Sequence, residues 1–261
     1  MLIDTHFHLD LMDNMQSLIH EFRSSDIGII AVGTTPKAFE RERQFCSGAK
    51  NIRVGIGLHP QLVMERTGEI SEFLSLMPKV QYIGEIGLDF NSAFISSKDE
   101  QIECFRAIVK ACTEQGNKVL SIHSVKAAGA VIDELERART FQTCKCIFHW
   151  FTGNVSERKR AIENGALFSV NPKMLRTKSG QETIKAIPGE AILLETDAPF
   201  TMKYHSAAEL KSELIHMVEA ISNLRERDMY GIIEKNTAVL WGEPVCILSP
   251  NLGQEWPERY E

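Results

Sequence analysis

Two histidines, His6 and His8, stand two residues apart near the amino terminus in the segment L-I-D-T-H-F-H-L-D. Side chains alternate between faces along a β-strand, so both imidazoles leave the same face and can close on one metal ion. Strand histidines are also often satisfied by backbone carbonyls, so this pair alone is a weak signal. A metal site here requires further ligands from the rest of the chain.

Further candidate ligands lie in or at the ends of other short apolar runs. Glu85 stands inside Q-Y-I-G-E-I-G-L, where a buried carboxylate is costly unless it is paired or bound to a metal. The runs V-L-S-I-H, C-I-F-H and A-I-L-L-E-T-D end at His123, His149 and Asp197. Singly, each is typical of a cap or a satisfied core histidine. Together, ligand types at five strand ends indicate a shared metal site.

The ligand types define the expected chemistry. Histidine and carboxylate ligands suit Zn, Mn, Fe or Mg better than a soft, thiolate-bound metal, and several on one face can hold two ions. We therefore expect two divalent ions per chain, Zn, Mg or Mn, with Glu85 as the bridge. Such a pair polarises a phosphoryl oxygen and lowers the pKa of a water toward about 7. Asp197 is expected to bind one ion and to accept the proton of the attacking water.

The elements that must position these residues alternate along the chain. Short apolar runs are separated by amphipathic stretches such as 98–115 and 126–137, where apolar residues recur at helical spacing. Eight such units predict a single (β/α)8 TIM barrel, an α/β fold whose catalytic groups lie at the carboxyl ends of several strands. The expected strands are residues 2–6, 27–32, 52–58, 80–86, 118–123, 145–149, 166–170 and 191–195.

Length and composition agree with this architecture. A chain of 261 residues commonly forms one barrel domain, which we assign to residues 1–242, and residues 243–261 are expected to form a tail packed on it. The net charge of -6 provides no basic surface for constitutive duplex binding. No basic segment precedes an apolar stretch at the amino terminus, and no apolar run approaches the roughly 18 residues of a membrane span. These features predict a cytoplasmic protein without a membrane partner.

Six segments carry a family resemblance. They are D-T-H-F-H-L-D (4–10), G-L-H-P (57–60), G-E-I-G-L-D-F (84–90), I-H-S (122–124), F-H-W-F-T-G (148–153) and L-E-T-D-A-P-F (194–200). In this order they resemble the TatD family of metal-dependent deoxyribonucleases, within the amidohydrolase-like barrels. The segment N-T-A-V-L-W-G at 236–242 is similar to the family's terminal helix.

This resemblance implies a division of the metal ligands and a substrate. His59 is implied to lie near the substrate phosphate. The implied reaction is hydrolysis of DNA phosphodiester bonds, in much of the family from the 3′ end, and the implied partner is DNA, most of all single-stranded DNA. The implied ligands are His6, His8, Glu85 and Asp197 for one ion and Glu85, His123 and His149 for the other.

Two departures from the family concern the grip on the substrate. After His123 many members carry H-x-R, whose arginine binds a phosphate through two hydrogen bonds, and here Val125 and Lys126 follow instead. Beyond Phe200 the family often has a Pro- and Arg-rich loop, whereas this chain reads T-M-K-Y-H-S-A-A. TatD-like proteins with divergent loops also occur in anti-phage defence clusters. A QatD-like role with protein partners in a defence complex is therefore a further expectation.

The candidate substrate contacts lie in loops after the strands. Lys126 follows His123, and Lys173 and Arg176 follow the seventh expected strand, where they would meet phosphates at the barrel mouth. A solvated charged loop explains these residues equally well. Trp150 would stack on a base, and packing within the barrel is an equal alternative for it.

Two other functional classes remain open. A hydrolase of another small phosphoester or amide would use the same barrel and ions, although many such enzymes bridge their metals with a modified lysine where this chain has Glu85. A binding or scaffold subunit with little turnover is the alternative that is not an enzyme; the complete ligand set argues against it, and the altered loops argue for it. Metal content and assays on single-stranded, duplex and small phosphodiester substrates separate the three classes.

Overall fold

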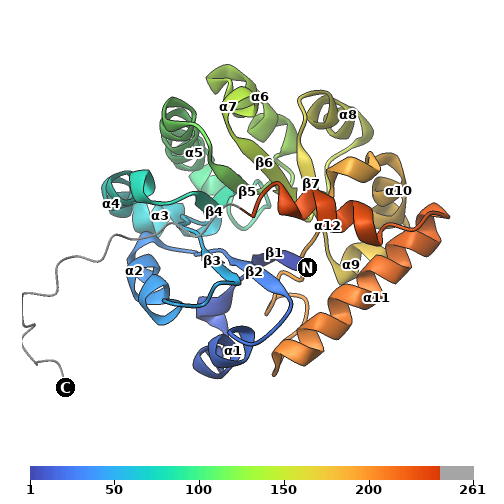
Figure 1. The fold of residues 1–261 in the computed structure, drawn as a ribbon. Coiled ribbons are helices and arrows are strands. Elements are labelled where there is room, and N and C mark those ends of the chain that lie inside the picture. Colours follow the sequence, from blue (N-terminus) through green and yellow to red (C-terminus); the bar gives the residue numbers. More distant parts are fainter. Residues whose placement is uncertain (242–261) are drawn as a thin grey trace, which may run out of the picture.

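The computed structural model describes residues 1–241, which form a ring of parallel strands surrounded by helices (Figure 1). Aliphatic and β-branched residues dominate the strands, as expected of a parallel sheet covered on its outer face by helices. The strands are β1 (Ile3–Phe7), β2 (Gly28–Ala31), β3 (Ile52–Val54), β4 (Tyr82–Gly87), β5 (Val119–His123), β6 (Lys145–His149), β7 (Leu167–Val170) and β8 (Ile192–Leu194).

The strand order confirms the predicted (β/α)8 barrel. Neighbouring strands follow the order β3-β2-β1-β8-β7-β6-β5-β4. The ring is completed beyond the end of β3, where Ile56 bridges to Ile83 of β4. The strand expected at 52–58 is shorter than predicted because the chain changes partner: the Gly55 N–H donates to Ala31 of β2 at 2.7 Å, and the next N–H donates to Tyr82 of β4 at 3.1 Å.

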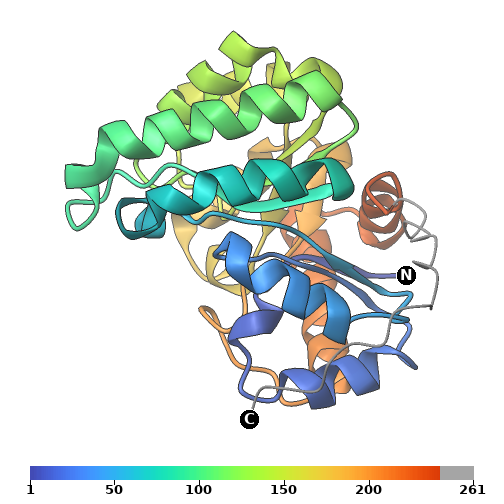
Figure 2. The same cartoon turned by 90° about the vertical axis from the view of Figure 1, so that its left-hand side faces the viewer.

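The helices lie outside the strands, and α5, α4 and α2 lie side by side along one flank (Figure 2). The helix predicted at 98–115 has the bounds of α5, whereas the one predicted at 126–137 begins later because Lys126 adopts a left-handed φ of 52°. The helices are α1 (Met15–Phe22), α2 (Pro36–Phe45), α3 (Val63–Arg66), α4 (Ile70–Leu76), α5 (Lys98–Gln115), α6 (Ala128–Ala138), α7 (Thr140–Thr143), α8 (Val155–Glu163), α9 (Pro172–Leu175), α10 (Lys178–Ala186), α11 (Ala207–Arg225) and α12 (Tyr230–Ala238).

Two apolar cores hold the barrel together. The larger core lies between strands and helices, and a smaller one fills the barrel interior near the amino ends of the strands. In β5 and β6, interior residues alternate regularly, so that the last residue of each strand is a histidine that faces the barrel axis. The smaller core consists of Ile3, Ile30, Val32, Tyr82, Val119, Ile147, Leu193 and Leu240.

Irregularities in β1 and β4 redirect two other side chains toward the axis. The register of β4 shifts between Ile83 and Ile86, and both of these residues pack in the outer core. Strict alternation would place them on opposite faces, so the shift turns Glu85 inward. A similar shift between Asp4 and Phe7 in β1 turns His6 inward.

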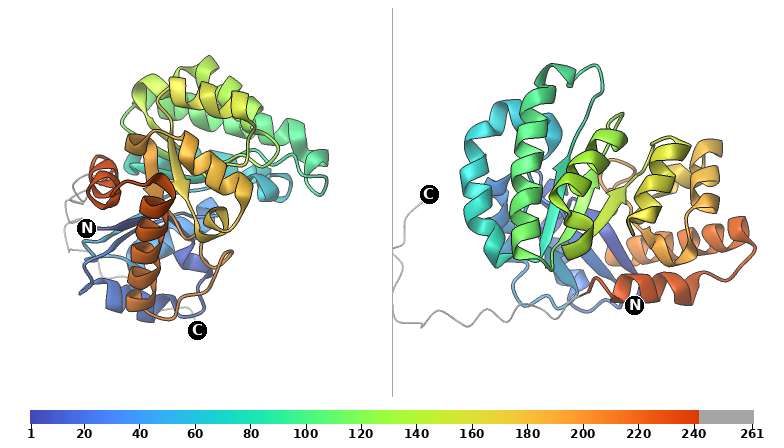
Figure 3. Two further views of the ribbon diagram at one scale, coloured as in Figure 1. Left: turned by 90° about the vertical axis from the view of Figure 1, so that its right-hand side faces the viewer. Right: turned by 90° about the horizontal axis from the view of Figure 1, so that it is seen from above.

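The amino end of the barrel is covered by the last described segment. Helix α12 lies across this end near the amino terminus (Figure 1) and packs beside α11 (Figure 3). Beyond it, Leu240 accepts a hydrogen bond from the Tyr82 hydroxyl at 2.8 Å. The tail predicted at 243–261 lies outside the described residues. Within residues 1–241, no helix combines the length and apolarity needed to cross a membrane.

Candidate metal centre

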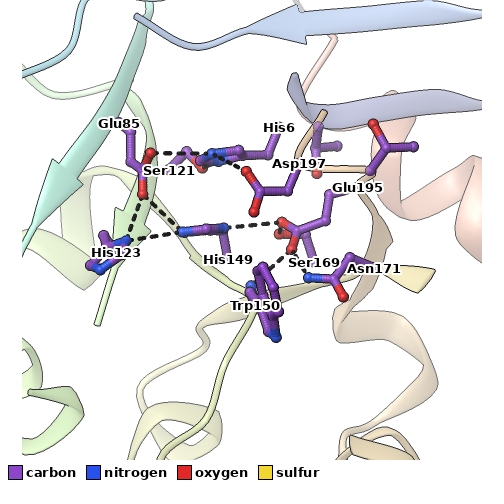
Figure 4. Close-up of polar contacts among 12 residues, drawn as sticks. His6, Glu85, Ser121, His123, His149, Trp150, Ser169, Asn171, Glu195 and Asp197 are labelled. Atoms are coloured by element: carbon purple, nitrogen blue, oxygen red, sulfur yellow. Dashed lines mark hydrogen bonds and ion pairs between the residues drawn. The ribbon is translucent and has the colours of Figure 1, made fainter. Parts of the chain in front are cut away.

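Glu85 lies among histidines at the carboxyl-end face of the barrel, and Figure 4 shows three of them, His6, His123 and His149. Its Oε2 atom lies 3.5 Å from His6 Nε2 and 3.3 Å from His8 Nε2. Its Oε1 atom lies 2.7 Å from His123 Nδ1 and 2.9 Å from His149 Nε2. The two oxygens of the carboxylate therefore face different histidines, as those of a bridging ligand would.

The donor set around Oε2 of Glu85 also includes Asp197. The Nε2 atoms of His6 and His8 lie 3.2 Å apart. Asp197 Oδ1 lies 3.7 Å from the former and 3.5 Å from the latter. Donors that bind one ion at about 2.0–2.2 Å with tetrahedral angles lie about 3.3–3.6 Å apart. The separations are therefore close to those required by one divalent ion.

The donor set around Oε1 of Glu85 contains three histidines. His123 Nδ1 lies 3.4 Å from His149 Nε2. The family resemblance implies that His59 lies near the substrate phosphate. Its Nε2 atom lies 3.2 Å from Oε1 of Glu85. Its side chain is 13% exposed and lines the cavity above the cluster, so it lies between the donor set and the space for a substrate.

The electrostatics of the cluster favour bound positive charge. Burial would raise the pKa of Glu85, but the nearby histidines, His59 and His149 above all, hold that pKa well below its usual range. Burial disfavours the charged form of His8, yet hydrogen bonds with Asp197 and Glu85 raise its pKa to about 9. Protons and divalent ions compete for such donors, so metal binding is expected to release protons and to weaken at low pH.

Asp197 is held firmly by its backbone. It adopts a left-handed φ of 54°, and its N–H donates to the His6 carbonyl at 3.0 Å. Its own carbonyl accepts the N–H of Phe200 at 2.8 Å. Although the residue is only 4% exposed, it lines the cavity. Asp197 thus lies near His6 on β1 and His8 directly after it, and it also borders the cavity that is available to water or substrate.

Asp4 is a supporting carboxylate that was not predicted from the sequence. It is fully buried and accepts the N–H groups of His6 at 3.0 Å and Thr196 at 3.1 Å, together with the Thr196 hydroxyl. Burial raises the pKa of Asp4 to about 7, although these hydrogen bonds lower it. Asp4 therefore ties the segment carrying His6 to the segment carrying Asp197. The available signal was a carboxylate inside an apolar strand.

Glu195 is a second missed carboxylate. It accepts the Trp150 N–H at 2.9 Å, the Asn171 side-chain amide at 3.0 Å and the Ser169 hydroxyl. Its Oε2 atom lies 3.7 Å from His149 Nδ1 (Figure 4). Glu195 thus fixes the loop after β6 beside the cluster. Its position two residues before Asp197 in L-E-T-D was the available signal.

Two further polar partners orient the histidine rings. Ser121 Oγ lies 2.7 Å from His6 Nδ1, and Asp89 Oδ2 lies 3.1 Å from His123 Nε2. Asp89 also accepts the Gln61 side-chain amide at 2.7 Å. Such partners of the second ring nitrogen fix the orientation and tautomer of a metal-binding histidine.

Two glycines permit the close backbone contacts around the cluster. At Gly87, with φ of 141°, a Cβ atom would lie 2.1 Å from the His123 carbonyl oxygen. At Gly57 a Cβ atom would lie 2.5 Å from the Glu85 nitrogen. A side chain at either position would displace the strands that carry Glu85 and His123.

A cavity of about 570 Å³ opens above the cluster. This volume lies within the range of about 300–1,000 Å³ typical of small-ligand sites. Its floor is formed by the cluster residues His59, Glu85, His123, His149 and Asp197. The other lining residues are Leu11, Thr34, Gln61, Leu62, Ser124, Val125, Trp150, Thr152 and Phe200.

The predicted substrate contacts lie at different places. Trp150 lines the cavity, whereas Lys126 and Arg176 are exposed and do not line it. The Lys173 ammonium lies 5.0 Å from the centre of a Trp150 ring and donates to the Phe200 carbonyl at 2.8 Å. Its charge is therefore engaged within the protein, and the phosphate contacts expected of these three cations remain predictions.

Comparisons with known proteins agree with this architecture. The metal-dependent hydrolase YabD of Bacillus subtilis, described as uncharacterized, is 28% identical over 238 residues, which cover 87% of this chain and 92% of the relative. The 3′-5′ ssDNA/RNA exonuclease TatD of Shigella flexneri is 26% identical over 230 residues, which cover 82% of this chain and 87% of the relative. The crystal structure of YJJV, a TatD homolog from Escherichia coli, has a TM-score of 0.79 at 20% identity, covers 93% of this chain and 98% of that one, and shares the fold.

The family comparison covers almost all of the barrel. The sequence matches the model of the family described as TatD related DNase over residues 3–242. This range contains every residue of the histidine and carboxylate cluster, which lies at the carboxyl ends of strands from all parts of the barrel. The chain belongs to the TatD related DNase family.

Proposed function

We propose that this protein is a metal-dependent deoxyribonuclease that removes nucleotides from the 3′ ends of single-stranded DNA, using two divalent ions. The observation that carries the proposal is the position of Glu85, whose two oxygens face separate groups of histidines. Family membership supports DNA hydrolysis, and the 3′-5′ exonuclease TatD among the relatives supports the 3′ polarity.

The contacts of the two Glu85 oxygens support one division of the ligands. When bound, Zn, Mg or Mn ions supply the charge that polarises a phosphoryl oxygen and lowers the pKa of water. The proposed ligands are His6, His8, Glu85 and Asp197 for one ion, and Glu85, His123 and His149 for the other.

Asp197 is the proposed general base. Its carboxylate borders the cavity, and an ionised carboxylate can accept a proton from an attacking water. The backbone hydrogen bond to His6 fixes its position relative to the donor set. Asp4 and Glu195 are proposed to act indirectly, by positioning the segments that carry His6 and His149.

His59 is proposed to contact the substrate phosphate. Its Nδ1 atom accepts the N–H of Gln61 at 3.2 Å, so a neutral ring carries its proton on Nε2. From Nε2, which lies 3.2 Å from Glu85 Oε1, His59 can donate to a phosphate oxygen in the cavity. The exposed Lys126 and Arg176 are proposed to contact phosphates of the DNA strand outside the cavity, where their charges are accessible.

The proposal extends to the cellular setting. Val125 and the divergent loop after Phe200 alter the substrate side of the barrel, which supports a partner that presents DNA within a defence complex. Such a role requires access to intracellular nucleic acid, so we assign the protein to the cytoplasm. Affinity purification of the tagged protein from its own cells, followed by fractionation, tests both assignments.

The test of the nuclease function uses the purified chain after removal and stepwise return of Zn, Mg or Mn. A 5′-labelled single strand should be shortened from its 3′ end, faster than the matching duplex, and chelation should abolish the reaction. A strand whose terminal 3′ linkage is a phosphorothioate serves as the matched control and should resist cleavage. Ion-dependent hydrolysis of a small phosphodiester but of no DNA strand would contradict the proposal.

A further inference from the structure

The walls of the cavity differ in chemistry from its floor. The floor carries the histidines and carboxylates, whereas the walls carry five apolar side chains together with the uncharged polar side chains of Thr34, Gln61, Ser124 and Thr152. Among the residues that the structure describes, no lysine or arginine lines the cavity. The walls therefore suit a flat, uncharged group better than a second phosphate. These apolar wall residues are Leu11, Leu62, Val125, Trp150 and Phe200.

Trp150 is held in place by contacts on its backbone and its ring. The residue adopts a left-handed φ of 40°, and its N–H donates to Glu195 at 2.9 Å. The Lys173 ammonium lies 5.0 Å from the centre of a Trp150 ring, a distance at which a cation is attracted to an aromatic face. A ring fixed in this way before binding loses little entropy when a ligand stacks on it.

Lys173 connects Trp150 with Phe200. Its ammonium also donates to the Phe200 carbonyl at 2.8 Å, so it joins the segments that follow β6, β7 and β8. These two contacts give the Lys173 ammonium partners within the protein beside the apolar wall. The two aromatic residues of the wall thus form one connected unit.

Phe200 brings apolar surface next to the donor set. Its ring centre lies 5.1 Å from that of His8, with the two rings at 89°. The residue is 55% exposed and lines the cavity, so its ring is accessible to a bound group. A group bound against Phe200 would therefore lie close to a phosphate held at the cluster.

We propose that Trp150 and Phe200 bind the nucleobase of the terminal nucleotide while the cluster takes the adjacent phosphodiester. The inference rests on the proposed nuclease function and deepens it: the substrate class is a single strand that ends in an unpaired base. Stacking on aromatic rings tolerates every base, so the site selects a free base and not a sequence. A terminal base pair must be opened before it can enter, which disfavours duplex ends.

Two matched strands test this inference. Both carry a 5′ fluorophore, and one ends in deoxyadenosine whereas the other ends in an abasic deoxyribose. Binding to the metal-free protein is followed by fluorescence anisotropy, and ion-dependent turnover of both strands is measured separately. We expect the wild-type protein to bind the strand with the terminal base on the order of tenfold more tightly.

Four variants assign the effect to the aromatic unit. Trp150→Ala should remove the preference for the terminal base and raise KM with little change in kcat. Trp150→Phe should retain most of the preference and a KM close to that of the wild type. Val155→Ala, which changes an exposed side chain on α8, is the control and should match the wild type. If Trp150→Ala fails to fold, Phe200→Ala gives the same test at a side chain that is 55% exposed.

The outcomes separate the inference from the nuclease proposal. DNA hydrolysis with equal affinity for both strands, or equal weakening of both strands in Trp150→Ala, would overturn the base-binding role and leave the nuclease intact. Base-dependent binding without ion-dependent hydrolysis would instead refute the nuclease and retain the base-binding unit.

Discussion

The bridging position of Glu85 leads to an expected difference in metal content between two variants. Glu85→Ala removes a donor from both sets, because Oε2 lies 3.3 Å from His8 Nε2 and Oε1 lies 2.9 Å from His149 Nε2. His123→Ala removes a donor from one set only, because His123 Nδ1 contacts Glu85 Oε1 and His149. We expect the first variant to lose both ions and the second to lose one.

The size of the effect follows from the number of donors lost. Losing an indirect partner of a metal-binding histidine typically lowers metal affinity about 10- to 100-fold. Loss of a direct donor should exceed that range, so Glu85→Ala should weaken both ions more than about 100-fold. In His123→Ala the set of His6, His8, Glu85 and Asp197 keeps all its donors. Its ion should be held within about tenfold of the wild-type affinity.

Competition with a chromophoric chelator measures both affinities, and elemental analysis after gel filtration gives the stoichiometry. His216→Ala is the control, because it removes an exposed histidine from α11. Circular dichroism establishes that each variant is folded. If folded Glu85→Ala retained one tightly bound ion, Glu85 would not bridge the two donor sets.

Two further predictions concern Asp197 and Glu42. Asp197→Asn should stay folded but lose at least about 100-fold in kcat on single-stranded DNA, because an amide cannot accept the proton; near-normal turnover would exclude Asp197 as the base. Glu42, on α2, is 2% exposed, and burial together with the nearby Asp10 raises its pKa well above the usual value. An acid whose pKa is raised on folding costs stability as pH rises above its unfolded value, by up to about 1.4 kcal/mol per pH unit until the folded pKa is reached. In urea titrations of the metal-free protein, the free energy of unfolding of Glu42→Gln should therefore rise relative to that of the wild type between pH 5.5 and pH 8. Glu40→Gln, at an exposed site on the same helix, should show no such rise. A difference between Glu42→Gln and the wild type that is equal at both pH values would contradict this reasoning.

The sequence predicts the barrel and the cluster for the same physical reason. A parallel strand buried on both faces needs a short apolar run, and a polar residue that ends the run lies at the carboxyl edge of the sheet. His123 and His149 follow this rule directly, since both end regularly alternating strands. All eight predicted strands are found, and their ends bring the predicted ligands together.

The orientation of Glu85 could not be read from the sequence. Strict alternation from Tyr82, which packs inside the barrel, would direct Glu85 toward the helices. The register shift between Ile83 and Ile86 reverses this direction, and such shifts depend on pairing between strands that are distant in sequence. Glu85 is nevertheless a candidate from the sequence, because a buried carboxylate requires a partner and because the segment G-E-I-G-L-D-F resembles the family.

The substrate side depends on contacts between loops, where residue type is a poor guide. Lys173 follows β7 in a position that suits a phosphate contact, yet its ammonium lies against Trp150 and the Phe200 carbonyl. That role requires all three loops to be in place, so no spacing within one segment could indicate it. The proposed metal ligands stand on strands or within three residues of a strand end, where the barrel fixes their positions, whereas Trp150 and Phe200 stand on loops that can change while the β-strands stay constant. A family built in this way can keep one metal chemistry and change which end of a DNA strand it accepts.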